Sequence, residues 1–330
     1  MSTDVTGVSP TAAAAGGAPA RRRPRLGPVA TTALRLVLTL LGLLTLLFFL
    51  VRLSGDPAAV LAGPSATSEQ LEEIRTGLGL DEPLLSQYVA FLGDMLRLDF
   101  GESVFTGEPA LDSVLAVLPA TLILVVTTVV TSVVVGIPCG VLLARAGRVA
   151  RRGVSFAMTL AQAVPSFVLG VGLIFVFAVN LGWLPAFGSG TPATLVMPTI
   201  ALAAFAVART ARMVAAELEQ GEDHDYLRTA YAKGASSRRV LWRHALPNAL
   251  PAVASAIVVE VSYLLSGAVV VEVLFAYNGI GKRLVDAIFA RDYPVVQAAV
   301  FVIGVFVIVV NLIGDALVRV IDPRTTRGSA

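Results

Sequence analysis

The sequence has few of the residues on which disulfide, metal and catalytic sites depend. Among its 330 residues there are one cysteine, Cys139, and two histidines, His224 and His244. A single cysteine excludes an intramolecular disulfide and cysteine-rich metal sites. The cysteine lies in an apolar run, where we expect it to be a small packing residue. His224 is flanked by Glu222, Asp223 and Asp225, but the two histidines lie twenty residues apart, and we expect both to be loop or interface residues rather than ligands. No metal site and no cofactor are therefore predicted.

Charged residues are also scarce, at 15% of the chain, whereas 56% of the residues are hydrophobic. Soluble globular domains carry about 25% charged residues, so this composition indicates a protein embedded in a membrane. The sequence has no Gly-x-x-x-x-Gly-Lys-Ser/Thr loop to hold nucleotide phosphates, so we do not expect this chain to hydrolyse ATP itself. It also lacks a nucleophile elbow and a zinc motif. The basic residues gather at the ends of apolar runs, which explains them without nucleic acid.

Long apolar runs predict an all-α integral membrane protein with six transmembrane helices. The runs cover residues 33–51, 114–144, 154–179, 194–208, 252–271 and 295–313. A helix needs about 20 residues to cross a hydrocarbon core of about 30 Å, and only the fourth run depends on its basic end to reach that length. The first run follows an arginine cluster and could be a secretory signal. We favour an uncleaved first span over residues 31–53, because the run is long enough to cross and no small-x-small cleavage site follows it immediately.

The distribution of basic residues predicts the orientation, since cytoplasmic segments carry an excess of lysine and arginine. With six spans and an inner N-terminus, nineteen of the 25 basic residues fall on the inner side. We therefore expect a multi-pass protein of the cell membrane with both termini in the cytoplasm. Residues 1–30, rich in Ala, Gly, Ser and Pro, are predicted to be a disordered cytoplasmic tail, and residues 321–330 a cytoplasmic C-terminal tail.

Between the first two spans, residues 54–112 are predicted to form a small helical insert outside the cytoplasm. Residues 55–112 hold eleven carboxylates and no long apolar run. Within them, residues 68–80 and 84–98 have the patterns of short helices. A segment of this length would be marginal as an independent domain, so we expect it to pack on the outer face of the bundle. Residues 113–320 then form a five-helix core.

Within this core, residues 217–250 are predicted to form a basic cytoplasmic loop between two spans. Asp225 suits the start of a helix, and Gly234 suits its end, because glycine adopts the left-handed conformation without steric cost. The apolar residues between them recur at helical spacing and so share one face. They are Tyr226, Leu227, Ala230 and Tyr231. A second, basic helix follows, and Pro247 is expected to interrupt it.

This loop resembles the cytoplasmic loop of importer-type ABC transporter permeases, whose signature is Glu-Ala-Ala, three residues, Gly, nine residues, Ile, one residue, Leu-Pro. The matching positions are Ala230, Gly234, Leu246 and Pro247, and the departures are Arg228, Thr229 and His244. The full string Asp-Tyr-Leu-Arg-Thr-Ala-Tyr-Ala-Lys-Gly, with Arg-His-Ala-Leu-Pro-Asn-Ala after it, is similar to the variant in the dipeptide/oligopeptide/nickel permease family. So are Gly-Ala-Val-Val-Val-Glu-Val-Leu-Phe at 267–275, Asn-Gly-Ile-Gly-Lys-Arg-Leu at 278–284 and Arg-Asp-Tyr-Pro-Val-Val-Gln at 291–297.

The resemblance covers about residues 30–325, with Asn278 standing where the family more often has proline. It implies a type I ABC importer permease fold and a function as the transmembrane permease subunit of an ATP-driven importer. The partners it implies, besides the lipid bilayer, are a second related permease subunit, two cytoplasmic ATPase subunits and an extracytoplasmic substrate-binding protein. Di- or oligopeptides are the favoured substrates, and nickel complexes, glutathione and haem are also compatible.

The resemblance further assigns the loop to ATPase docking. The docking residues it implies are Asp225, Tyr226, Leu227, Arg228, Thr229, Ala230, Lys233 and Gly234, with Leu246 and Pro247 completing the loop motif. In this hypothesis Tyr226, Leu227 and Ala230 insert into a groove on an ATPase subunit. Arg228, Thr229 and Lys233 lie at its rim, and Gly234 sets the turn. The alternative is an amphipathic helix that lies on the lipid headgroups.

One carboxylate lies within the fifth predicted span and another at its outer end. Glu260 is flanked by valines in mid-span, where an ionised carboxylate is costly and should face a water-filled path or a partner. We hypothesise that it lies on the translocation path, the alternative being a protonated or hydrogen-bonded carboxyl at a helix interface. Glu272, near the outer end, is expected to be a solvated helix end or part of a structural ion pair rather than a substrate contact.

Two other classes of protein fit less well. A self-sufficient secondary transporter would need paired intramembrane ionisable residues and usually inverted repeats, and Glu260 is the only strong mid-span charge that the sequence offers. A membrane enzyme would need a catalytic constellation inside the bilayer, and the sequence contains none. The prolines and glycines of the spans, among them Pro138, Pro165, Gly170 and Gly172, are most simply kinks and sites of close helix packing.

Overall fold

A computed structural model of the chain describes residues 28–53, 57–62, 66–77, 79–221 and 224–321, and these residues are almost entirely helical. Most of the two predicted tails therefore lies outside the described residues. The helices in order are α1 (Pro28–Leu53), α2 (Pro57–Ala62), α3 (Ser68–Gly77), α4 (Leu84–Leu96), α5 (Ala110–Leu115), α6 (Leu118–Arg145), α7 (Arg148–Ala163), α8 (Ser166–Leu173), the π-helical η1 (Ile174–Asn180), α9 (Pro192–Gly221), α10 (Asp225–Ala232), α11 (Ser237–Val240), the π-helical η2 (Leu241–Ala245), α12 (Leu246–Leu274), α13 (Ile280–Ala290) and α14 (Tyr293–Ile321).

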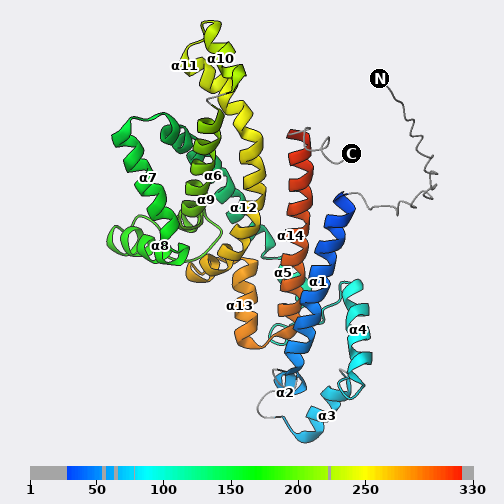
Figure 1. The fold of residues 1–330 in the computed structure, drawn as a ribbon. Helices are drawn as coiled ribbons and strands as arrows, with labels where there is room; N and C mark the ends of the chain where they lie inside the picture. Colours follow the sequence, from blue (N-terminus) through cyan, green and yellow to red (C-terminus); the bar gives the residue numbers. More distant parts are fainter. Residues whose placement is uncertain (1–27, 54–56, 63–65, 78, 222–223, 322–330) are drawn as a thin grey trace, which may run out of the picture.

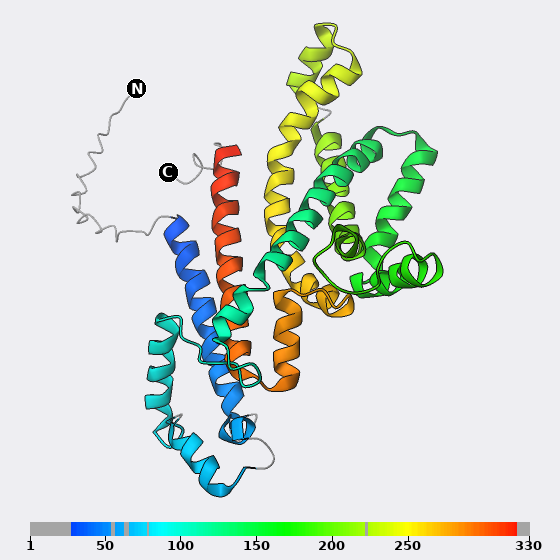
Figure 2. The same cartoon turned by 180° about the vertical axis from the view of Figure 1, so that it is seen from behind.

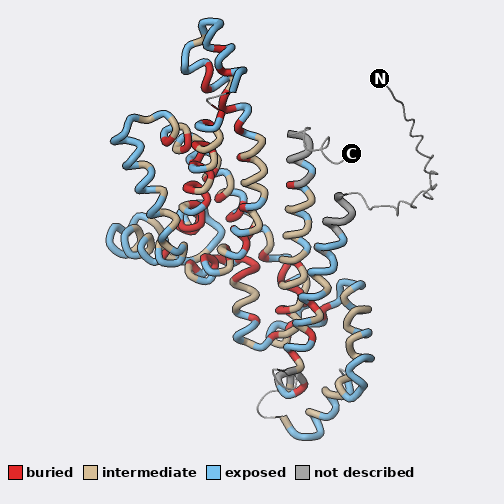
Figure 3. Tube along the Cα trace, in the orientation of Figure 1, coloured by how far each residue is buried: buried red, intermediate tan, exposed pale blue. Residues whose placement is uncertain are grey.

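Three long helices form the centre of the molecule. α9 packs against both α6 and α12, α7 and α8 pack on α9, and α14 joins α1 to α12. The short helices α10 and α11 lie at one end of this bundle, and α2 and α3 lie at the opposite end (Figures 1 and 2). Buried residues concentrate where α6, α9 and α12 meet, whereas α7 is largely exposed (Figure 3).

The predicted spans correspond to long helices of the structure. Among the described residues, four helical segments are long and apolar enough to cross a membrane: Ala110–Arg145, Pro192–Gly221, Ser237–Leu274 and Tyr293–Gly314. The run predicted over 154–179 is divided at Pro165 into two helices that meet at 103°, which make a fifth span if the bent pair is counted as one. The described apolar part of α1, Val37–Arg52, is shorter than a full span, so six spans stay a prediction.

The helices approach most closely where one of them carries glycine. A Cβ atom added at Gly140 of α6 would lie 2.5 Å from the Cβ of Val214 and 2.6 Å from the carbonyl oxygen of Ala211, both on α9. Gly136, one turn earlier, faces Thr210 in the same way. Small residues four apart let two backbones pack closely inside a membrane, so this pair fixes the contact between α6 and α9.

Two glycines of α8 for which the sequence predicts the same role differ in their surroundings. A Cβ atom at Gly170 would lie 2.5 Å from Cδ2 of Leu274, so the prediction of close helix packing is confirmed there. A Cβ atom at Gly172 would meet no atom of another described element within 4 Å, so the prediction of close packing is wrong for that residue among the described parts of this chain.

The insert predicted over 54–112 contains both helices expected in it, as α3 and α4. Its contacts with the core are polar as well as apolar: the hydroxyls of Thr45 and Tyr88 are 2.8 Å apart. At its other end, the Ser103 hydroxyl donates to Oδ2 of the buried Asp292 at 2.6 Å, and the Val104 N–H donates to Oδ1 of the same carboxylate. Asp292 thereby ties the last loop of the insert to the turn between α13 and α14.

Helix α13, which the sequence pattern did not predict, lies between α12 and α14 (Figure 1). It begins after Gly279 and ends at Arg291, which takes the left-handed conformation with φ of 59°. Its buried side contributes Ile280 and Ala287 to a core shared with α5 and α14. This short helix therefore links two long helices at the end of the bundle that carries the insert.

The contact at Gly140 can be tested by adding one methyl group. Gly140→Ala should lower the free energy of unfolding by about 1–3 kcal/mol, the usual cost of overpacking, despite the higher helix propensity of alanine. Gly172→Ala is the matched control, since it gives the same gain in propensity without a neighbour to displace. Thermal unfolding of the two purified variants in detergent compares them directly. Equal melting temperatures would contradict the close approach of α6 and α9.

Candidate functional site

Helix α10 forms where the loop motif predicts it. It runs from Asp225 to Ala232, with the acidic side chain of Asp225 in its first turn. His224 precedes it in an extended conformation and accepts the first helical hydrogen bond, from the Leu227 N–H at 3.0 Å. An acidic residue in the first turn interacts favourably with the N-terminal N–H groups of the helix, so the predicted start is confirmed.

The end of α10 is a Schellman turn centred on Gly234. The N–H of Gly234 donates to the carbonyl oxygen of Tyr231 at 2.9 Å, and the N–H of Ala235 donates to that of Ala230 at 3.2 Å. Gly234 has φ of +80°, a conformation that side chains with a Cβ atom adopt at a cost. The predicted stop at this glycine is therefore confirmed, and the turn directs the chain back toward the bundle.

The apolar side of α10 is buried against this chain's own long helices. Leu227 is 2% exposed and Ala230 7% exposed. The core they enter includes Val214 and Leu218 of α9, Val240 of α11, and Leu246, Ala249 and Val253 of α12. In this structure neither Leu227 nor Ala230 can enter a groove on another protein, because their side chains already fill the space between α9 and α12.

The opposite side of α10 is exposed and polar. We call it the loop face, and it consists of Asp225, Tyr226, Arg228, Thr229, Tyr231 and Lys233. The Thr229 hydroxyl donates to the carbonyl oxygen of Asp225 at 2.8 Å within the helix. The docking residues named from the sequence thus divide into two groups, one forming the loop face and one packed inside.

The return path from α10 to α12 is a continuous helix. α11, η2 and α12 together form one helical segment, Ser237–Leu274. The prediction that Pro247 interrupts the second helix is wrong: Pro247 lies in the first turn of α12, directly after the widened π-helical turn of η2. A proline ring clashes with the carbonyl four residues earlier in a regular α-helix, and a widened turn before it lets the helix continue. Leu246, the other predicted motif residue, is buried beside Leu227.

An ion pair between a buried carboxylate and a partly exposed arginine lies deeper in the bundle. Glu260 of α12 is 4% exposed, and its Oε2 atom is 2.8 Å from Nη1 of Arg209 on α9. Within the described part of the chain, no hydrogen-bond donor is aligned with the same carboxylate oxygen. Arg209 is one of the basic residues that charge placement assigns to the inner end of its span, and no local pattern indicates that it reaches Glu260.

Glu260 also lines a cavity of about 350 Å³, and Arg209 lies next to this cavity rather than among its lining residues. The break between α7 and α8 forms one wall, at Ala163, Val164, Pro165 and Ser166. α9 contributes Leu202 and Phe205, and α12 contributes Glu260, Tyr263 and Leu264. The guanidinium carbon of Arg209 lies 5.6 Å from the centre of the Tyr263 ring, whose side of α12 is exposed.

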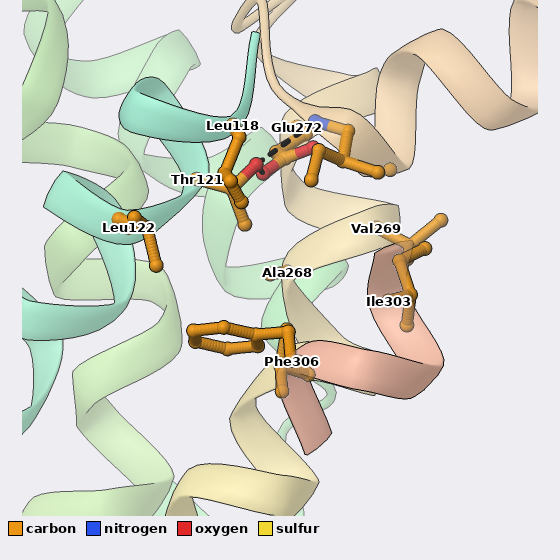
Figure 4. A pocket seen from close by; sticks show the side chains of 11 residues that line it. Leu118, Thr121, Leu122, Ala268, Val269, Glu272, Ile303 and Phe306 are labelled. Atoms are coloured by element: carbon orange, nitrogen blue, oxygen red, sulfur yellow. Dashed lines mark hydrogen bonds between the residues drawn. The ribbon is translucent and has the colours of Figure 1, made fainter. Parts of the chain in front are cut away.

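Glu272, twelve residues further along α12, has a different environment. It is fully buried, and its Oε1 accepts a hydrogen bond from the Thr121 hydroxyl of α6 at 2.7 Å (Figure 4). Its Oε2 accepts the Lys282 N–H at 3.1 Å. Thr121 in turn accepts the Ile280 N–H at 2.8 Å. The sequence-based expectation of a solvated helix end or an ion pair is wrong: Glu272 and Thr121 together cap the N-terminus of α13 from two other helices.

This cap explains the two glycines in the Asn-Gly-Ile-Gly-Lys string. A Cβ atom at Gly279 or Gly281 would collide with the Glu272 carboxylate. The absence of a side chain at both positions lets the carboxylate approach the N–H groups of the first turn of α13, where a negative charge is favourable. The family-like string at 278–284 is therefore accounted for by helix capping.

Two family models match the sequence. The one described as "Binding-protein-dependent transport system inner membrane component" matches residues 136–327. The one described as the N-terminal part of a binding-protein-dependent transport system membrane component matches residues 29–125.

Curated relatives match nearly the full length of the chain. A probable peptide ABC transporter permease protein of Sinorhizobium fredii is 40% identical over 288 residues, which cover 84% of this chain and 92% of that protein. A glutathione transport system permease protein of Escherichia coli is 36% identical, covering 86% of this chain and 96% of that protein. An oligopeptide transport system permease protein of Bacillus subtilis is 36% identical, covering 86% and 94%.

Solved structures resemble the fold. An inward-facing form of the MetNI methionine ABC transporter matches with a TM-score of 0.53 at 22% identity, covering 63% of this chain and 96% of that chain. The crystal structure of an amino acid ABC transporter with histidines matches with a TM-score of 0.51 at 18% identity, covering 64% and 94%. These two matches show that the chain shares its arrangement of helices with the membrane subunits of solved ABC transporters.

The shared cap of α13 predicts the effect of removing one hydroxyl. Thr121→Val should lower the free energy of unfolding by about 1–3 kcal/mol, because it leaves the buried carboxylate of Glu272 and the N–H of Ile280 each short of a partner. Thr121→Ser is the matched control, since it keeps the hydroxyl. Thermal unfolding gives the difference, and faster amide hydrogen exchange in α13 of the valine variant locates it. Unchanged exchange there would contradict the capping role.

Proposed function

The chain belongs to the family of binding-protein-dependent transport system inner-membrane components, and on that premise we propose that it helps to form the membrane pathway of an importer for di- or oligopeptides. Membership makes it a transmembrane permease subunit of an ABC importer. Its helices are those of a type I importer permease, the architecture of the methionine transporter that it matches.

The observation that carries the proposal is the construction of α10. Its apolar side is packed between α9 and α12, and its loop face is exposed. Because α10 is fixed in this way, a displacement of its exposed side would be transmitted directly to the two long helices α9 and α12, without a flexible segment between them. We propose that the loop face docks on an ATPase subunit.

Within this proposal the predicted docking residues have two roles. Asp225, Tyr226, Arg228, Thr229 and Lys233 would contact the ATPase. Leu227 and Ala230 would transmit the movement to α9 and α12 from inside, and Gly234 would hold the turn that places α10. Leu246 and Pro247 belong to the helix that carries the movement onward.

The complete transporter would contain this chain, a second related permease subunit, two cytoplasmic ATPase subunits and an extracytoplasmic substrate-binding protein. ATP hydrolysis would take place on the ATPase subunits. Closure of the ATPases would draw the docking helices of the two permease subunits together. The transport pathway between the subunits would then open to the outside, where the binding protein releases substrate. Hydrolysis would return the pathway to its inward-facing state. Such a cycle requires a ligand or nucleotide that binds one state more tightly than the other.

The orientation follows from the same assignment. ATPase docking requires α10 in the cytoplasm, and the excess of arginine on that side supports this placement. The termini would then also be cytoplasmic. The insert at 54–112 lies at the end of the bundle opposite α10 (Figure 1), so it would face the binding protein.

Peptides are the favoured substrates because two of the relatives described above carry peptide or oligopeptide transport in their names, while another carries glutathione, itself a modified tripeptide. The buried pair of Arg209 and Glu260 is the kind of intramembrane pair that a secondary transporter would need. The family match favours an ATP-driven importer over that alternative.

Reconstitution tests the proposed function. The chain would be placed in proteoliposomes with its second permease subunit, its ATPases and its binding protein, and uptake of a labelled dipeptide would be measured. We expect uptake only with ATP and the binding protein both present. Peptide accumulation in vesicles that contain this chain alone, driven by an ion gradient, would refute the assignment.

Charge reversal on the loop face tests the docking role. Arg228→Glu combined with Lys233→Glu should reduce the ATPase retained with the purified permease by about tenfold, because like charges across an interface are unfavourable. The control is Arg75→Glu combined with Arg97→Glu, the same change of charge on the insert, where both arginines make exposed pairs of small energetic value with Glu72 and Asp94. Equal retention in both variants would rule the loop face out as the docking surface.

A further inference from the structure

The cavity beside Glu260 is lined by this one charged side chain, and the partner of Glu260, Arg209, lies directly behind it. Glu260 is almost completely buried, whereas the side chain of Arg209 is 38% exposed. The Oε2 atom of Glu260 makes an ion-pair contact of 2.8 Å with Arg209, but among the described residues no hydrogen-bond donor is aligned with it. A buried carboxylate oxygen in this condition has the capacity to accept a further donor.

The break in the α7–α8 segment adds a second pair of opposite charges to the same cavity. α7 ends at Ala163 and α8 begins at Ser166, after a bend of 103°. Both ends line the cavity. The last carbonyl groups of a helix carry partial negative charge and its first N–H groups partial positive charge. In discontinuous membrane helices such ends contact the charged groups of substrates and ions.

A ligand suited to this cavity carries one cation and one anion. The remaining lining residues carry no charge: Leu202, Phe205 and Leu264 are apolar, and Gln162 and Ser166 are polar but neutral. The volume of about 350 Å³ lies at the lower end of the range for small-molecule sites and accommodates a small peptide. The cavity therefore has the size and the polarity for a peptide with free termini.

We propose that this cavity is a transit site for zwitterionic small peptides, in which Glu260 binds the α-ammonium group and Arg209 binds the C-terminal carboxylate. The proposal rests on the proposed function and specifies the chemical class of substrate at that site. In the empty site the two side chains neutralise each other. On arrival of a peptide they separate, and each exchanges its partner for a terminus of the ligand, so that no buried charge is left alone.

Arg209 is the partner that moves. Its long side chain is partly exposed, and its guanidinium group already lies near the ring of Tyr263, which can hold it by a cation–π contact after the pair opens. Glu260 is fixed in the centre of α12 by burial. A dipeptide spans several ångströms between its termini, at about 3.3–3.6 Å for each residue, and the swing of Arg209 provides that separation.

The test measures ligand binding to the purified permease complex without ATP or binding protein, as the rise in melting temperature with millimolar dialanine. N-acetyldialanine and dialanine amide serve as probes that lack one charge each. We expect dialanine to bind at least about tenfold more tightly than either blocked form, because a blocked terminus leaves one charge, either the buried Glu260 or the partly exposed Arg209, without a partner.

Two single variants give a crossed pattern that a purely structural ion pair would not produce. Glu260→Gln should abolish the discrimination against the N-acetylated peptide and keep that against the amide. Arg209→Gln should do the reverse. If Arg209→Gln fails to fold, because it leaves Glu260 unpaired, the double variant Glu260→Gln/Arg209→Gln removes both charges and should lose both discriminations.

The matched control is Arg151→Gln/Glu219→Gln, which removes the exposed ion pair between α7 and α9 outside the cavity and should behave as wild type. Equal binding of all three peptides by the wild-type complex, or an unchanged preference in the double variant, would overturn the inference. Failure of ATP-dependent uptake with normal discrimination in binding would count against the proposed function alone.

Discussion

Helices inside a bilayer gain little by burying apolar side chains against one another, because the surrounding lipid tails are equally apolar. What holds them is close backbone contact and the satisfaction of polar groups within the protein. Both are visible here. Gly136 and Gly140 allow α6 to lie directly on α9, and the buried hydroxyl of Thr121 and carboxylate of Glu272 supply partners to the start of α13. These contacts fix α6 on α9 and hold α13 against α6 and α12.

The three buried carboxylates of the described chain differ in the kind of partner that each one has. Glu272 and Asp292 accept hydrogen bonds from hydroxyl and backbone N–H groups of neighbouring elements, which hold them in one arrangement. Glu260 instead faces a charged side chain that is long and partly exposed. Fixed neutral donors suit a structural role, whereas a long, partly exposed charged partner suits the exchange of partners that we propose for Glu260.

The sequence predicts the elements that depend on local pattern. Apolar runs locate the long helices, and Asp225 and Gly234 locate the ends of α10. It does not predict contacts between distant segments: the Thr121 side chain that caps α13 is 159 residues from Ile280, and the short helix itself has no cap in its own sequence. The sequence also led us to place Leu227 and Ala230 in a groove on another protein. An apolar stripe on a helix has the same pattern whether it packs on another protein or on the neighbouring spans of its own chain. The predicted helix interruption at Pro247 was wrong because no known sequence pattern indicates the widened turn that precedes this proline.

The burial of Leu227 and Ala230 also has a consequence for how the protein is made. Their core draws on both α9 and α12, which the ribosome synthesises before and after α10. α10 can therefore become ordered only after both neighbours have entered the bilayer in the correct register. If the loop face docks on an ATPase subunit as proposed, a chain that inserts wrongly would offer no ordered α10, and faulty copies would be left out of the assembled transporter without a separate inspection step.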